Sequence, residues 1–196
     1  MKKAFLLKVV VLLALISTPL LLIAETVGPS GGTAAQDIKL TVEGKALIAI
    51  VNTVAANTNI SLSLAGATVA GEAMVTVTTN SDSKLRISSS VEDGTTRKIT
   101  AQIFPALTAT NTELFVTLVN PGDFLPDPLN GGAGTGEKNL TDGTAALEVV
   151  TGIKTCWSGI EPSSGYGVTY RYAKKAGSTF WTSGTTTVTY TITAAS

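Results

Sequence analysis

Residues 85–103 read LRISSSVEDGTTRKITAQI and contain two stretches in which apolar and polar side chains alternate. Alternation with a period of two places successive side chains on opposite faces of a β-strand. Between the stretches lie Asp93 and Gly94, a pair that tolerates the positive φ angles of a tight hairpin loop. The segment therefore predicts a β-hairpin with one apolar face.

The same alternation recurs along the rest of the chain, and helical periodicity is almost absent. We expect further strands at 38–43, 46–51, 60–64, 75–78, 114–118, 147–149, 168–172 and 187–193. Turn-forming residues separate these segments, as they do in β-sandwiches. The predicted fold is an all-β, antiparallel β-sandwich of immunoglobulin-like or pilin-like type, built as one domain from residues 25–196.

The segment 121–143 is rich in Pro, Gly, Asn and Asp, and it predicts a long loop, because proline cannot donate to a central sheet ladder. Loops of this length are often functional. We expect this loop to bind no cofactor. A calcium site is the alternative, because Ca²⁺ prefers hard oxygen ligands. The side chains that could supply these oxygens are Asp123, Asp127, Asn130, Glu137 and Asp142.

The N-terminus has the layout of a secretory signal peptide, which predicts export from a bacterial cytoplasm. Lys2, Lys3 and Lys8 stand before or at the start of the apolar run 9–23. We expect cleavage after Ala24, so that residues 1–24 are removed. A retained membrane anchor is the alternative, and a lipoprotein is excluded because no Cys follows the run. The expected location is the periplasm, the cell surface or the extracellular space, with membrane contact only before cleavage.

The charge balance excludes a nucleic-acid partner. The whole chain has 14 basic and 14 acidic side chains, and loss of the signal peptide removes lysines but no acids. A mildly acidic chain without a basic cluster lacks the positive surface that phosphates require. Charged residues make up 14% of the chain, and the remaining polar residues are largely Thr, Ser, Asn and Gly, as suits extracellular β-structure.

No catalytic constellation is present, and we expect no enzymatic activity. The sequence contains no histidine, which rules out Ser-His-Asp and Cys-His sites. A two-carboxylate hydrolase is the remote alternative. Its candidate acids are isolated in polar strand or loop positions: Glu72, Glu113, Glu148 and Glu161. The single cysteine, Cys156, cannot form an intrachain disulfide, and we expect it to be a buried apolar side chain.

Aromatic residues concentrate in the last third of the chain. Tyr170, Tyr172 and Tyr190 occupy strand positions at which packing in the core is expected. Trp157 and Trp181 lie beside Gly and Ser, in predicted loops or strand ends. Exposed indole rings stack on sugars, so these two tryptophans are the candidate glycan-binding or interaction surface.

Both ends of the chain after the signal peptide carry an alternating strand. Leu40 and Val42 lie near its start, and Val188, Tyr190 and Ile192 lie near its finish. Such a strand can complete its own sheet, or it can be donated to the open edge of a neighbouring subunit. The two interpretations remain open from the sequence.

Two segments, VTVTTNSDSKLRIS at 75–88 and GTTTVTYTIT at 184–193, resemble strands of secreted bacterial fimbrial-type β-sandwich proteins. The resemblance implies a non-enzymatic surface or filament subunit. Two features differ from the chaperone-assisted pilins, because the disulfide common in them is missing and the chain continues through residues 194–196.

The expected function is therefore that of an exported structural or adhesive subunit, assembled by β-strand addition. Its expected partners are further copies of itself or other surface proteins, with glycans as further candidates. A monomeric carbohydrate-binding or adhesin module is the alternative function.

Overall fold

The computed structural model describes residues 44–54, 59–107, 111–143, 145–178 and 182–195. They belong to one compact unit, Val42–Ser196. The fold is all-β, and its strands form two antiparallel sheets. Among the described residues, no helix is long and apolar enough to cross a membrane.

The larger sheet has six strands. In spatial order they are β1 (Ala46–Asn52), β2 (Val77–Ser89), β9 (Tyr166–Lys174), β4 (Thr112–Val119) and β6 (Lys138–Asn139), while β8 (Cys156–Trp157) also pairs with β2. On β2, β4 and β9, alternate side chains are buried and the others are at least partly exposed. Alternation in the sequence therefore corresponds to a sheet with one buried face, as predicted.

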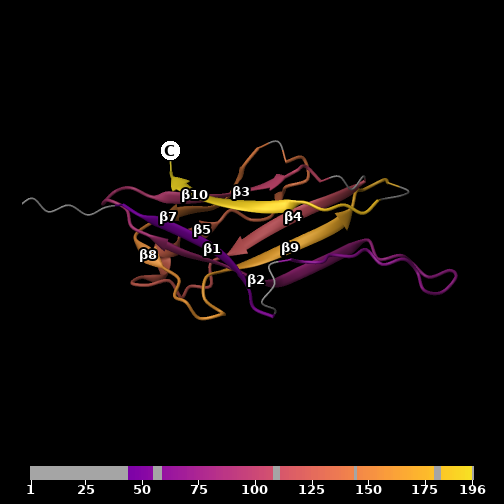
Figure 1. Ribbon diagram of the computed structural model, residues 1–196, viewed down its shortest axis with the longest axis horizontal. Helices are drawn as coiled ribbons and strands as arrows, with labels where there is room; N and C mark the ends of the chain where they lie inside the picture. Colours follow the sequence, from indigo (N-terminus) through magenta and orange to yellow (C-terminus); the bar gives the residue numbers. More distant parts are fainter. Residues whose placement is uncertain (1–43, 55–58, 108–110, 144, 179–181, 196) are drawn as a thin grey trace, which may run out of the picture. The chain divides into compact units, whose positions relative to one another are not determined.

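The smaller sheet has four strands. Their spatial order is β10 (Thr187–Ala194), β3 (Arg97–Phe104), β7 (Leu147–Ile153) and β5 (Ala133–Gly134). Figure 1 shows this sheet as a second layer facing the larger one. Side chains from both sheets, such as Leu85 and Val116 from one and Ile99 and Val149 from the other, form one apolar core. The architecture is thus β-sandwich-like, as expected.

The predicted hairpin around Asp93 and Gly94 is wrong. Gly94 does take a positive φ of 77°, in the turn between β2 and β3. However, β2 pairs with β1, β8 and β9, whereas β3 pairs with β10 and β7, so the connection crosses from one sheet to the other. Alternation identifies the apolar face of each strand, and it carries no information about which strand lies beside it.

The predicted strand 60–64 is also absent. Its alternate residues Ile60 and Leu62 are half-buried and pack against the core, but the segment belongs to neither sheet. Close by, the N–H of Val75 donates to the carbonyl of Ala65 (3.1 Å), and β2 begins only at Val77. The segment therefore contributes apolar side chains to the core without ladder hydrogen bonds.

The segment 121–143 contains short ordered elements. A 3₁₀ helix, η1 (Pro128–Gly131), begins where the Asp127 side chain accepts a hydrogen bond from the Leu129 N–H (2.9 Å). β5 then joins one sheet and β6 the other. Phe124 and Leu140 from this segment are buried in the core. The proline-rich segment is therefore part of the packed structure.

Candidate functional site

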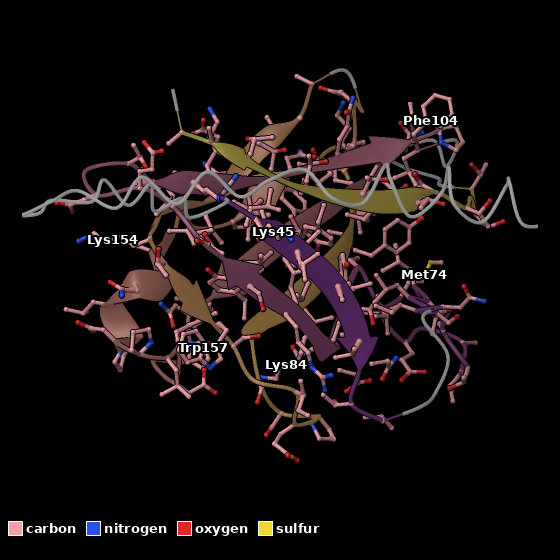
Figure 2. The ribbon with its side chains drawn as sticks, turned by 60° about the vertical axis from the view of Figure 1, so that its left-hand side comes forward. Lys45, Met74, Lys84, Phe104, Lys154 and Trp157 are labelled. Carbon is pink, nitrogen blue, oxygen red and sulfur yellow. The ribbon has the colours of Figure 1, made fainter. Side chains whose placement is uncertain are left out.

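The strands β1 and β10 lie next to each other, and each pairs with a strand on one side only. They run in opposite directions, because Ala46 lies opposite Ser89 while Ala194 lies opposite Arg97, at the same end of the sandwich. Figures 1 and 2 show the indigo β1 and the yellow β10 close together at this end and diverging toward the other. Two edge strands thus border one side of the sandwich.

The hydrogen-bond pattern shows which residues face the open edges. The N–H of Ala195 donates to the Thr96 carbonyl, and the N–H of Ser90 donates to the Lys45 carbonyl. In an antiparallel ladder every second residue points its main-chain groups at the partner. By this alternation, Val188, Tyr190 and Ile192 on β10, like Ile48 and Ile50 on β1, point their N–H and C=O groups toward the open side. Among the described residues, these groups have no backbone partner there.

The same five residues turn their side chains toward the core. All of them are only half-buried, although they pack against fully buried neighbours. The Tyr190 hydroxyl donates to the Tyr170 hydroxyl across the two sheets (2.9 Å), and burial raises the pKa of both phenols. The open side of the sandwich therefore combines unpaired main-chain groups with incompletely covered apolar side chains.

Of the residues predicted for strand donation, Val188, Tyr190 and Ile192 lie on β10, which pairs with β3 and completes a sheet of its own chain. Leu40 and Val42 lie outside the described residues, as does Trp181. Within the described part of the chain, β10 thus presents an edge that can accept a strand.

Trp157 lies on β8, opposite Ser88 of β2, and its side chain is 45% exposed. Its backbone also exchanges two hydrogen bonds with Leu125. Cys156 points the other way, is buried, and has its pKa raised to about 11 by burial. The tryptophan therefore faces the outer side of the larger sheet, at the end where the chain enters β1.

Several acidic residues are engaged in contacts with other side chains or with the backbone. Within the described residues, no cluster of three or more His, Cys, Asp or Glu could hold a metal ion. Glu137 instead forms a bidentate ion pair with Arg171 (2.6 and 2.7 Å), which lowers the pKa of Glu137. Glu148 pairs with Lys98 (2.5 Å), and Glu72 accepts hydrogen bonds from Thr68 and Val69. The carboxylates of Glu72, Glu137 and Glu148 are therefore hydrogen-bonded or ion-paired to other residues of the protein.

A polar hollow of about 460 Å³ lies at the β2–β3 connection and is lined by residues 91–96, Asn130, Lys154 and Thr155. The Thr155 hydroxyl accepts from the Val91 N–H (3.0 Å) and donates to the Val91 carbonyl (3.1 Å). These bonds attach the connection to the segment between β7 and β8. The hollow is therefore bounded by a fixed loop.

Three features of the candidate surfaces were not predicted from the sequence: the open edge of β1 and the exposed positions of Leu47 and Leu125. The run 46–51 does carry a signal, since it is apolar at every position. Leu47 is 68% exposed on the outer face, which is unusual for a strand at an unprotected edge. An all-apolar edge strand indicates an interaction surface.

No protein-family model matches the chain, and neither a curated protein nor a solved structure does so.

Proposed function

We propose that the protein is an exported, non-enzymatic structural or adhesive subunit whose copies are joined by β-strand addition. The observation that supports this most strongly is the open side between β1 and β10. A strand added there would satisfy main-chain groups of Ile48 and Val188, and it would cover half-buried side chains. One added strand thus provides both hydrogen bonds and apolar contact.

The proposed donor is the segment 38–43 of a neighbouring copy, in which Ile38, Leu40 and Val42 alternate with polar residues. Only Gly44 and Lys45 separate it from β1.

Donation from one copy to the next is a head-to-tail contact, which generates a ring if its rotation closes and an open filament if it does not. The signal-peptide pattern of residues 1–24 supports the export that a surface subunit requires. The two-sheet architecture is compatible with the immunoglobulin-like or pilin-like type that we propose for it.

The test uses the chain as a bacterial host exports and processes it, with intact mass checking for a start at Glu25. Light scattering and electron microscopy should show ordered oligomers or filaments. V188P removes an N–H that points to the open side and leaves the ladder to β3 intact, so it should give folded monomers. T185P, just before β10, is the matched control and should still assemble.

Two variants distinguish donation from self-completion. L40K/V42K places charges on the donor strand and leaves the acceptor edge intact, whereas V188P blocks the acceptor and leaves the donor. Each should be monomeric alone, and a mixture should give one-to-one dimers that grow no further. A mixture that stays monomeric, with circular dichroism showing folded sheets, would mean that segment 38–43 does not join copies. Removal of residues 184–196 should unfold the domain, because β10 completes the smaller sheet.

A further inference from the structure

A row of exposed side chains crosses the outer face of the larger sheet. Leu47 lies opposite Ser88, Ser88 lies opposite Trp157, and Trp157 lies opposite Leu125. Residues directly opposite in antiparallel pairs project from the same face. Leu47, Trp157 and Leu125 are 68%, 45% and 51% exposed. Apolar side chains therefore stand on both sides of the small Ser88.

The position of Ser88 between larger neighbours makes a groove. Adjacent strands lie about 4.8 Å apart, so the backbones that carry Leu47 and Trp157 are separated by about 10 Å across β2. The groove encloses about 240 Å³, and its lining includes Lys45, Leu47, Ser88, Ser90 and Trp157. Within the described residues, the hydroxyls of Ser88 and Ser90 form no protein hydrogen bond. The groove thus has Trp157 on one side, Leu47 on the other and serine hydroxyls between them.

Basic residues occupy outward-facing positions of β1 and β2 beside the groove. The outward-facing positions of β1 and β2 beside it include Lys45, Lys84 and Arg86, and no acid occupies an outward position on either strand between residues 45–51 or 84–90. The Arg86 Nη2 donates to the Glu161 carbonyl (2.7 Å), while its Nε is buried without a partner. The groove therefore suits an anionic ligand.

We propose that this groove binds a carboxylate-bearing sugar, such as a uronic or sialic acid unit of a glycan. The C–H face of the sugar ring would stack on Trp157, its hydroxyls would bond to Ser88 and Ser90, and its carboxylate would lie beside Lys45. An acidic peptide fits less well, because β2 is paired on both sides at Ser88 and offers no free main-chain groups to an extended chain. Recognition here depends on side chains.

The test is isothermal titration calorimetry of the exported, processed chain with 3′-sialyllactose and trigalacturonate, each compared with a neutral counterpart, lactose or a galactose trisaccharide. At least one acidic sugar should bind more tightly than its counterpart, and added salt should reduce the difference, because screening weakens the attraction to Lys45. In a W181F background, binding should quench the remaining indole fluorescence.

W157A should weaken binding by about tenfold or more, through loss of the stacking contact. W157F keeps a ring face and should retain most of the affinity, which separates stacking from misfolding. F104A is the matched control, since Phe104 is an exposed aromatic (79%) at the opposite end of the sandwich, and it should bind like the unaltered protein.

Absence of heat with both acidic sugars would overturn the proposal, as would equal binding of the neutral sugars or unchanged binding by W157A. Quenching by a poly-glutamate peptide with the affinity of the sugars would identify the surface as a site for acidic peptides instead. These outcomes are independent of assembly. The V188P monomers carry the same groove and should bind the acidic sugars with the affinity of the unaltered protein.

Discussion

Tyr166 connects three parts of the sandwich through one side chain. Its backbone pairs with Leu85, and its ring packs against Phe124 with a centroid distance of 4.7 Å. Its hydroxyl donates to the carbonyl of Gly131 at the end of η1. The ring is fully buried, and burial raises the pKa of the phenol. A single residue thus fixes the proline-rich segment on the larger sheet.

Y166F should lower the free energy of unfolding by about 1–3 kcal/mol, because the buried Gly131 carbonyl would lose its hydrogen bond. Urea denaturation followed by circular dichroism measures this change. Y172F is the control, since Tyr172 is only half-buried and its hydroxyl has no protein hydrogen bond among the described residues. Equal losses in the two variants would contradict the structural role of the Tyr166 hydroxyl.

Alkaline pH should destabilise the protein through its buried phenols. Burial raises the pKa values of Tyr166, Tyr170 and Tyr190 above the ordinary value of 10.0, so the folded state resists their deprotonation. This stabilisation is complete below about pH 10 and is lost as the pH rises further, because only the unfolded chain then ionises readily. The free energy of unfolding, measured from neutral pH upward, should stay constant up to about pH 10 and then decrease. In the double variant Y170F/Y190F, the free energy of unfolding should decrease less steeply with pH. The same slope as in the unaltered protein would refute this explanation.

At the scale of elements, two glycines of the segment 121–143 are required for different reasons. Gly134 lies on β5, where a Cβ would collide with the carbonyl oxygen of Leu118 on β4. Gly136, two residues later, has a positive φ of 84° and open space around it. One glycine is thus required by packing and the other by backbone conformation.

G134A should therefore destabilise the domain by about 3 kcal/mol, since the two strands would have to separate. G136A should cost about 1 kcal/mol, because an L-residue at positive φ is strained but meets no obstacle. Thermal or urea unfolding of the pair gives the comparison. The reverse order would mean that β5 does not pack against β4 as described.

The sequence predicts single strands well and their partners poorly. Alternation located β3, β4, β7, β9 and β10, whereas β1 was located as a continuous apolar run. The two-residue strands β5, β6 and β8 are too short for such a pattern, and they form where surrounding packing places them. The groove beside Trp157 had no signal of its own, since Leu47 and Leu125 become its neighbours only through strand register.

At the scale of the whole molecule, stability rests on burial and sheet hydrogen bonds. The only cysteine in the chain, Cys156, is buried at the start of β8 and forms no disulfide with the described residues. One core from both sheets extends across the sandwich, including the segment with Phe124. The fold therefore does not depend on the redox state of its surroundings.

Cys156 should resist thiol reagents in the folded protein and react completely in urea. Burial limits access and raises the pKa of the thiol to about 11, so that little nucleophilic thiolate exists at neutral pH. Labelling with iodoacetamide, followed by mass spectrometry, measures the protection. Rapid labelling without denaturant would show that the end of the sandwich around β8 opens readily.

The crossing between β2 and β3 has a consequence for the time that the chain needs to fold. Among the described strands that follow one another in sequence, only β1 and β2 pair with each other, and even they are separated by residues 53–76. Nearly every ladder must therefore close a long loop before it forms, and chains with such distant pairings fold in milliseconds to seconds. The longer a newly made chain remains unfolded, the longer it can pass through a narrow translocation channel, which is what the proposed export requires.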